Sequence, residues 1–301
     1  MPFDRRLLAL RHWPAWLGIG VLVLYGNLPA VLGRTLGRTL GWLMLILGGE
    51  RVQIARRNIE ICFPERTAGE RPDLLRRNLL ALGEGSYEFA RAWWGSSRRW
   101  QRGLRVEGIE ILERLQAEGR GVLLLSGHFF TLDICGRLLC SVIPAAAMYR
   151  RHRGPVLEWA IRRGRMRYAS AMFAREELRA AVRFLKRGGI LWYAPDQDML
   201  GQEHVFAPFF GVAAATITAT HQLQRLTGAA VVPFFHARDG RGGYRLRIGP
   251  ALPDQVGETA AENAARVNAL IEQMVREAPT EYLWSHRRFK TRPEGGSKLY
   301  P

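Results

Sequence analysis

The sequence predicts an α/β protein with a mostly parallel central sheet flanked by helices and an N-terminal membrane-anchoring helix. From Gly103 onward, short apolar runs alternate with amphipathic stretches, as in parallel sheets that are covered by helices. Before that point, residues 13–32 carry no charged side chain, and about 20 such residues are enough to cross a bilayer. We therefore expect a membrane anchor and interfacial segment at 1–48, an α/β domain at 49–290 and a loose polar tail at 291–301.

The apolar stretch at 13–32 has three interpretations. A cleaved signal peptide fits worst, because no Ala-x-Ala-like site follows it before Arg34 and Arg38. A buried core helix would also be apolar. A single anchor fits best, but Arg on both sides leaves its orientation open, whereas a segment embedded in one leaflet would keep both flanks cytoplasmic. A second apolar stretch at 40–47 is too short to span a bilayer alone.

The remaining elements follow from apolar periodicity and from proline and glycine. One helix ends before Pro64, because the residue preceding a proline disfavours helical geometry, and another covers 71–94. Beyond Gly103 the pattern predicts strands at 104–106, 122–126, 142–148, 190–194, 229–236 and 244–248, and helices at 109–118, 131–139, 156–168, 176–187, 216–227 and 260–277. The run from Val122 to Leu125 is unbroken and apolar, which predicts a strand buried on both faces.

The charge balance favours an anionic partner. The chain has 44 Lys and Arg against 27 Asp and Glu, a net charge of +17, and most of the basic residues are Arg. Such a surplus is typical of proteins that bind nucleic acid or an anionic membrane surface, and nine Trp fit a membrane interface. We find no motif of a nucleic-acid-binding domain, such as paired aromatics on an RNA-binding strand, so we expect a membrane partner and no nucleic acid.

The cysteines indicate neither a disulfide framework nor a zinc site. Cys62, Cys135 and Cys140 form no CxxC pair and are odd in number, which fits a reducing compartment. Cys135 and Cys140 lie in an apolar helical pattern, so we expect them in the core.

Polar residues follow three of the predicted strands, where α/β proteins place their sites. The first group is His128 and Asp133. With His128 in a loop and Asp133 in the first helical turn, the carboxylate can hold one ring nitrogen and leave the other as a general base. Such a base can activate an alcohol for direct attack on an ester or thioester, without a nucleophilic Ser; Ser126 lacks the Gly-x-Ser-x-Gly elbow.

Taken alone, the five-residue spacing fits a structural histidine at a strand end better than a catalytic one. A metal site is a third interpretation, but no other histidine has suitable spacing, and we expect His204, His221 and His236 to be structural.

The second and third groups follow later strands. Tyr149 and Arg150 precede a basic helix that contains Arg165, which indicates either a solvated basic face or a clamp for phosphate or a developing oxyanion. The density of Arg favours phosphate. Asp196 and Asp198 can coordinate a metal or fix a loop. The apolar segment at 206–212 suits contact with an acyl chain or membrane if exposed, and the core if buried.

Together these segments resemble the lipid A biosynthesis acyltransferases (lauroyl and myristoyl transferases), within the lysophospholipid and glycerolipid acyltransferase superfamily. The resemblance covers about residues 10–290 and is carried by Arg56–Glu65, Gly127–Asp133, Tyr149-Arg150 with Leu157-Glu158-Trp159, Pro195–Asp198 and Val205–Gly211. Asp133 stands where lipid A acyltransferases usually carry Glu, and Asp is the residue of the glycerolipid branch.

The resemblance implies an inner-membrane enzyme with one N-terminal anchor and a cytoplasmic catalytic domain. It implies transfer of a fatty acyl group from acyl carrier protein to a hydroxyl of a phosphorylated lipid A precursor, with no metal and no cofactor besides the carrier thioester. The expected catalytic residues are His128 and Asp133, and the expected substrate-binding residues are Tyr149, Arg150, Arg165, Asp196 and Asp198. Two alternatives stay open: transfer to a lysophospholipid or another glycolipid, and a non-enzymatic basic membrane-binding protein.

Overall fold

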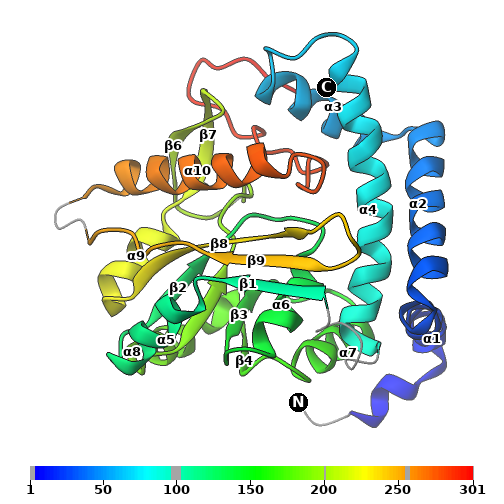
Figure 1. The fold of residues 1–301 in the computed structure, drawn as a ribbon, viewed down its shortest axis with the longest axis horizontal. Coiled ribbons are helices and arrows are strands. Elements are labelled where there is room, and N and C mark those ends of the chain that lie inside the picture. The colour runs from blue at the N-terminus through cyan, green and yellow to red at the C-terminus, as the bar shows by residue number, and fades with distance from the viewer. Residues whose placement is uncertain (1–3, 96–102, 200, 255–257, 301) are drawn as a thin grey trace.

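A seven-stranded sheet forms the centre of the molecule, and a separate two-stranded hairpin lies beside it (Figure 1). The computed structural model describes residues 4–95, 103–199, 201–254 and 258–300. The strands are β1 Leu104–Glu107, β2 Val122–Leu125, β3 Ala146–Tyr149, β4 Ala171–Ala174, β5 Ile190–Tyr193, β6 His204–Phe209, β7 Val212–Ile217, β8 Ala230–Arg238 and β9 Tyr244–Ile248. The helices are α1 Trp13–Asn27, α2 Ala30–Leu47, α3 Glu50–Cys62, α4 Glu70–Trp94, α5 Ile109–Ala117, α6 Leu132–Cys140, α7 Pro155–Arg165, α8 Leu178–Lys186, α9 Ala219–Thr227 and α10 Ala260–Glu277.

The sheet has the order β1-β9-β8-β2-β5-β3-β4. Strands β8, β2, β5, β3 and β4 run parallel, whereas β9 pairs antiparallel with β8 and carries β1 parallel to itself. The predicted mostly parallel α/β fold is therefore confirmed. Along β2, Leu123 and Leu125 pack into the cluster that contains α10, whereas Val122 and Leu124 pack with α5 and α6. Burial on both faces explains its uninterrupted apolar sequence.

The carboxyl ends of the parallel strands meet at one edge of the sheet, and α4 stands across that edge (Figure 1). The helix approaches closely because of Gly85, where a Cβ atom would lie 2.8 Å from the Cβ of Phe130. Since Phe130 belongs to the segment between β2 and α6, this contact places α4 directly beside the loop that carries His128.

The expected anchor at 13–32 is two helices rather than one. Pro29 caps α2, and Leu28 before it is extended, because a residue that precedes proline avoids helical geometry. In Figure 1, α2 runs alongside α4, while α1 is seen nearly end-on at its base. As a result, the helix with the length and composition to cross a membrane is α2, which includes the stretch at 40–47, and lies later in the chain than the predicted stretch at 13–32.

Helix α2 packs on α4 through a stripe of glycines. Gly33, Gly37 and Gly41 are buried, and a Cβ atom at Gly37 would lie 2.5 Å from the carbonyl oxygen of Gly83. Any larger residue on this stripe would push the two helices apart, so the glycines bring the backbones into contact.

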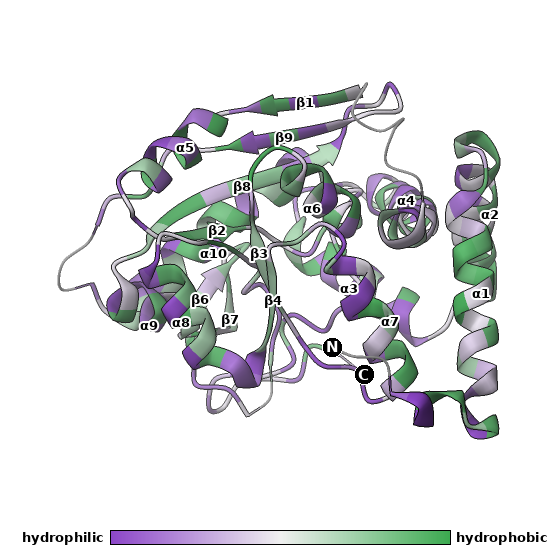
Figure 2. Ribbon diagram, turned by 90° about the horizontal axis from the view of Figure 1, so that it is seen from below, coloured by the Kyte–Doolittle hydropathy of each residue, from purple (hydrophilic) through white to green (hydrophobic). Residues whose placement is uncertain are grey.

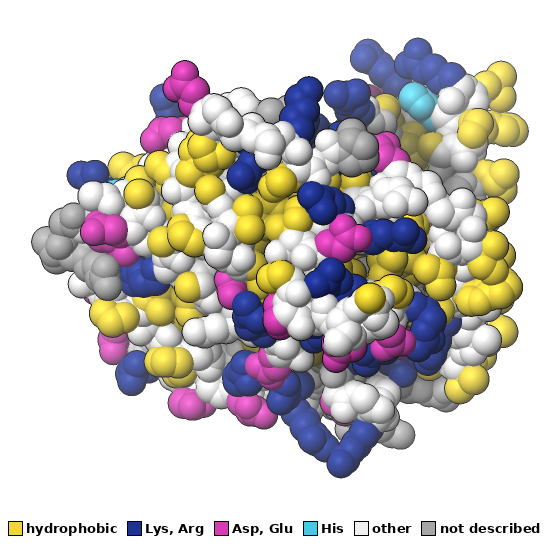
Figure 3. Space-filling model, turned by 90° about the horizontal axis from the view of Figure 1, so that it is seen from above, with side chains coloured by type: hydrophobic (Ala, Val, Ile, Leu, Met, Phe, Trp, Pro, Cys, Tyr) yellow, Lys and Arg dark blue, Asp and Glu magenta, His cyan; other side chains and the backbone are white. Residues whose placement is uncertain are grey.

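The opposite faces of α1 and α2 are apolar and exposed. Figure 2 shows both helices at one side of the molecule, with α4 between α2 and the sheet, and Figure 3 shows hydrophobic side chains along that side. The exposed residues are Trp13, Leu17, Val21 and Leu24 in α1, and Val31, Leu32, Leu36, Leu40, Trp42, Leu43, Ile46 and Leu47 in α2. A continuous face of this kind is typical of contact with a membrane.

Strands β4, β6 and β7 are not among the strands predicted from the sequence. Strand β4 was not predicted, because the Ala171–Ala174 sequence has little β propensity and forms a strand only by pairing with β3. The apolar segment at 206–212 belongs to the β6–β7 hairpin, in which Phe209 and Phe210 are buried and Phe206 is 38% exposed. The segment therefore alternates between core and surface: Ala207, Phe209 and Phe210 are buried, whereas Phe206, Pro208 and Gly211 are exposed.

Two residues at the end of the tail expected to be loose, Leu299 and Tyr300, contact α3, whereas residues 294–298 are exposed. Leu299 packs against the main core, and the Tyr300 hydroxyl donates a 2.5 Å hydrogen bond to Asn58.

Candidate active site

The loop after β2 holds His128 at the edge where the parallel strands end. Its backbone N–H donates to Asp196 Oδ2 at 2.8 Å, and its carbonyl oxygen accepts from the backbone N–H of Leu283 at 2.9 Å. The next pair continues this ladder, since Phe130 donates to the carbonyl of Glu281 at 2.9 Å. The backbone around His128 is therefore fixed from two sides before its ring makes any contact.

Asp196, in the loop after β5, holds the His128 ring. Its Oδ1 atom lies 2.5 Å from His128 Nδ1, and its side chain is 1% exposed. Burial alone would raise the pKa of Asp196, but the charge of His128 and the hydrogen bonds from His128 and Tyr282 outweigh burial and lower that pKa to about 2. A carboxylate that stays ionised beside Nδ1 orients the ring and favours the tautomer with its proton on Nδ1.

The other ring nitrogen of His128 is available to a substrate. The side chain is 30% exposed, and Nε2 has no hydrogen-bond partner among the residues that the structure describes. The ring lines a small pocket, together with Asn58, Asp196, Gln197, Tyr282, Leu283, Trp284, His286 and Arg288. An oriented imidazole with one free nitrogen at a pocket wall is the geometry of a general base.

The structure does not bring Asp133 to His128, and this corrects the predicted pair. Asp133 Oδ1 accepts from Trp93 Nε1 at 2.9 Å and from Arg165 Nε at 2.8 Å, and its Oδ2 accepts from Arg165 Nη2 at 3.2 Å. The reason is the direction of α6, which turns its first residues toward α4 and α7. The five-residue spacing alone could not distinguish Asp133 from a carboxylate 68 residues away.

Arg165 is committed to Asp133 and does not face the pocket as a free cation. Burial acts to lower the pKa of Arg165, but the Asp133 charge and hydrogen bonds outweigh it and raise that pKa. The guanidinium also lies over the Trp93 ring, 5.2 Å from its centroid. This buried ion pair joins α6, α7 and the end of α4.

Tyr149 and Asp198 make structural contacts. The Tyr149 hydroxyl donates to Glu158 at 2.6 Å, and burial together with that carboxylate raises the pKa of Tyr149 to about 12. Asp198 accepts from the N–H and the hydroxyl of Thr291 at 2.6 and 2.9 Å, and so fixes a loop, one of the roles considered for it. Of the five residues expected to bind substrate, Asp196 lies at the His128 pocket and Arg150 is exposed just beyond β3.

His236 lies beneath the site and is neutral. It is fully buried against Phe129 and Trp192, and its Nδ1 atom lies 2.9 Å from the Thr131 hydroxyl. Burial and the charge of His128 lower the pKa of His236 to about 3. These contacts fit the structural role expected from the sequence.

The family-model comparison identifies the wider relationship: residues 1–291 match the bacterial lipid A biosynthesis acyltransferase model. The chain belongs to that family. It is 41% identical to the lipid A biosynthesis palmitoleoyltransferase of Escherichia coli K12, over 99% of this chain and 98% of that protein. It is 40% identical to the lipid A biosynthesis lauroyltransferase of the same strain over the same shares, and 36% identical to a lipid A biosynthesis acyltransferase of Haemophilus influenzae over 97% and 95%. The resemblance is confirmed.

The sequence of Arg56–Glu65, one of the segments that resemble the lipid A acyltransferases, indicated no role, and the structure shows what this segment contacts. Asn58, within Arg56–Glu65, donates to the carbonyls of Trp284 and His286 at 2.6 and 2.7 Å. Asn78 on α4 likewise donates to the carbonyls of Thr280 and Tyr282 at 2.9 Å each. Both asparagines are buried, and together they hold the segment that lines the His128 pocket. Tyr282 and His286 were missed because nothing in their local sequence marks them as site residues.

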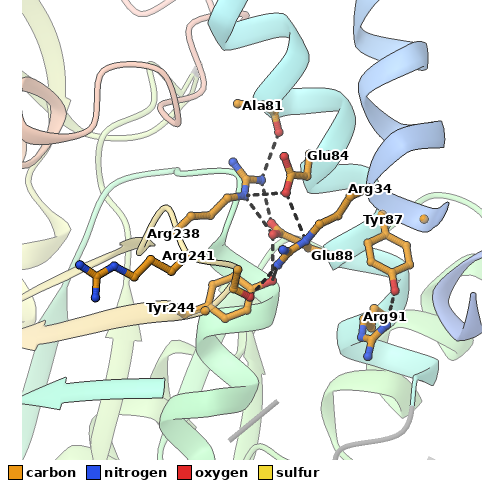
Figure 4. Close-up of polar contacts among 12 residues, drawn as sticks. Arg34, Ala81, Glu84, Tyr87, Glu88, Arg91, Arg238, Arg241 and Tyr244 are labelled. Atoms are coloured by element: carbon orange, nitrogen blue, oxygen red, sulfur yellow. Dashed lines mark hydrogen bonds and ion pairs between the residues drawn. The ribbon is translucent and has the colours of Figure 1, made fainter. Parts of the chain in front are cut away.

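A buried ionic network connects the N-terminal helices of this lipid A acyltransferase to the same segment. Figure 4 shows Arg34 of α2 and Arg238 of β8 converging on Glu84 and Glu88 of α4. Glu88 is fully buried and accepts from Arg238 at 2.7 and 2.9 Å. The backbone N–H of Arg238 also donates to Glu281. The network therefore extends from the apolar helix to Glu281, whose carbonyl accepts from Phe130 in the loop that carries His128.

Proposed function

We propose that this chain transfers a fatty acyl group from acyl carrier protein to a hydroxyl of a phosphorylated lipid A precursor. The contact between Asp196 and His128, which leaves Nε2 open at a pocket wall, carries the proposal. The names of the relatives support lipid A biosynthesis as the pathway. The net charge of +17 suits both an acidic carrier protein and a phosphorylated lipid.

The reaction needs no covalent intermediate on the protein. His128 Nε2 removes the proton of the acceptor hydroxyl as its oxygen attacks the thioester carbonyl. The tetrahedral intermediate collapses, the carbon–sulfur bond breaks, and the thiolate takes the proton back from the imidazolium. Asp196 stays ionised throughout and stabilises the imidazolium. General base catalysis of this kind is worth about 10²- to 10⁴-fold in rate.

The exposed faces of α1 and α2 give the enzyme access to a lipid acceptor. We propose that these faces are embedded in the bacterial inner membrane and that the catalytic domain lies on the cytoplasmic side, where the carrier protein is found. Arg34 points away from that apolar face toward Glu84, so its charge is paired within the protein.

The test is acyl transfer by the purified full-length protein in detergent or lipid, with an acyl-carrier-protein donor and mass spectrometry of the products. We expect His128→Ala to lower kcat at least about 100-fold, while the control His204→Ala, at an exposed histidine on β6, retains wild-type kcat. Activity of His128→Ala within a few-fold of wild type would contradict the mechanism. Faster transfer to a lysophospholipid than to the lipid A precursor would contradict the assigned acceptor.

A further inference from the structure

Two arginines stand next to each other just beyond the ends of neighbouring parallel strands. In the β3–β4 ladder, Tyr149 is paired with Ala174, so Arg150 and Arg175 are the first residues after the same rung. Adjacent strands are about 4.8 Å apart, so the two arginine side chains extend from neighbouring backbone positions at the edge of the sheet that carries His128.

The carboxylates around this pair are engaged elsewhere. Glu158 accepts from the Tyr149 hydroxyl and from the backbone N–H of His152, and Glu177 accepts from the N–H of Ala174. Glu176 and Glu177 also form ion pairs with Arg151, whose guanidinium nitrogens lie 3.8 Å from Glu176 and 3.5 Å from Glu177.

Farther along the edge, Asp133 is bound by Arg165 and Asp196 by His128. Among the residues that the structure describes, neither Arg150 nor Arg175 has a hydrogen bond or an ion pair.

The two guanidinium groups act on each other electrostatically. Arg175 is partly buried, and burial together with the positive charge of Arg150 lowers its pKa, despite opposing effects of Tyr193 and Glu176. Arg150 is exposed and Arg175 is partly buried, and the nearby carboxylate of Glu176 acts on Arg175 only through its charge, without an ion pair. An anion between them would offset the repulsion and satisfy their unused donors.

The position relative to the dyad suggests which reactant supplies the anion. Arg175 lies within electrostatic range of Tyr193, the last residue of β5, and Asp196 follows three residues later. An anion held by Arg150 and Arg175 would therefore lie on the same edge of the sheet as the His128–Asp196 pair, with β5 between β3 and β2. Guanidinium forks match phosphate oxygens in bidentate geometry, which an ammonium group does not do.

We propose that Arg150 and Arg175 form a two-guanidinium subsite that binds a phosphate group of a reactant. The inference rests on the proposed acyl transfer and deepens it by adding Arg175 as a specificity-determining residue. The phosphate can come from the lipid acceptor or from the phosphodiester of the carrier's pantetheine arm, and the two sources make different kinetic predictions.

The test compares Arg150→Gln, Arg175→Gln and Arg175→Lys with a control, Arg179→Gln, whose side chain is exposed one turn farther along in α8. Direct binding of inorganic pyrophosphate to the purified full-length protein is measured by calorimetry. We expect the Arg150→Gln and Arg175→Gln variants to weaken that binding about tenfold or more and Arg175→Lys to weaken it less, while the control binds like wild type.

Kinetics identify the source of the phosphate. A tenfold or greater rise in KM for the lipid acceptor alone, absent with an acceptor that lacks phosphate, assigns the subsite to the acceptor. A rise in KM for the carrier donor alone assigns it to the pantetheine phosphodiester. Unchanged pyrophosphate binding with unchanged KM values overturns the subsite, as does an equal loss of kcat with both acceptors. Normal pyrophosphate binding by a wild-type protein that transfers no acyl group would instead overturn the proposed function.

Discussion

Two carboxylates at the same edge of the sheet, Asp196 and Asp133, have opposite surroundings. Asp196 is paired with a histidine whose ring is 30% exposed, so the pair has one closed side and one side open to a pocket. Asp133 is paired with Arg165, and both side chains are mostly buried, at 11% and 18% exposure. The difference teaches that proximity in sequence to His128 is a poor guide to which carboxylate contacts its ring.

The largest expected effect is that of Asp196→Asn on turnover. The amide keeps the size of the side chain but removes the charge that orients His128 and stabilises its protonated form. We expect kcat to fall at least about 100-fold, since the equivalent change in other His–Asp pairs costs up to about 10⁴-fold. The measurement is kcat at saturating donor and acceptor, with Asp133→Asn as the matched control. If Asp133→Asn lowered the kcat of folded protein as much as Asp196→Asn does, the proposed division of roles would be wrong.

The next effect concerns stability and the ion pair between Asp133 and Arg165. Asp133→Ala leaves the buried guanidinium of Arg165 without its partner, and Arg165→Met leaves the buried carboxylate of Asp133 without its partner. Each single variant should therefore lower the free energy of unfolding by about 3–5 kcal/mol. The double variant removes both charges, so its loss should be clearly smaller than the sum of the single losses. Denaturant unfolding in detergent measures all three. Simple additivity would show that the two side chains do not interact.

A smaller effect concerns the pH dependence of stability, in which a third carboxylate at this edge, Glu281, should differ from Asp196 and Asp133. Burial, with the charges of Glu88 and Glu84, raises the pKa of Glu281 to about 7, although Arg238 acts to lower it. A raised pKa in the folded state means that its protonated form stabilises the fold below about pH 4.5, and that this contribution disappears as the pH rises through 7. The unfolding free energy of the wild type should therefore fall by up to about 3 kcal/mol between pH 5 and 8, and this fall should be absent in Glu281→Gln.

The measurement is the unfolding free energy of wild type and Glu281→Gln at several pH values in that range. Asp196 makes the opposite prediction, because its pKa is lowered to about 2 and its contribution disappears only as the pH falls from about 4 toward 2. A wild-type stability that is flat or rises between pH 5 and 8, and is unaffected by Glu281→Gln, would contradict the assignment.

The sequence predicted the parts of this molecule that depend on local pattern. The unbroken apolar run of β2 indicated a strand buried on both faces, and the alternation of strands and helices indicated the mostly parallel sheet. Strand ends correctly located His128, Arg150 and Asp196 at one edge. These features follow from periodicity, which each segment carries within itself.

The parts that were missed depend on contacts between distant segments. Asp196 could be recognised as the partner of His128 only from the pairing of β2 with β5, since 68 residues separate them. Tyr282 reaches the site because buried asparagines on α3 and α4 hold its segment there. The break at Pro29 was visible in the sequence, but the glycine stripe that packs α2 closely on α4 was not interpreted.

The most direct test of the central claim is the hydrogen bond on His128 Nδ1. In protein labelled with ¹⁵N-histidine, the Nδ1 proton of His128, assigned by its loss in His128→Gln, should resonate downfield because it is hydrogen-bonded to the buried carboxylate of Asp196. We predict that Asp196→Asn abolishes or strongly shifts this resonance and that Asp133→Asn leaves it in place. A resonance that survives Asp196→Asn and disappears in Asp133→Asn would show that Asp133 orients His128.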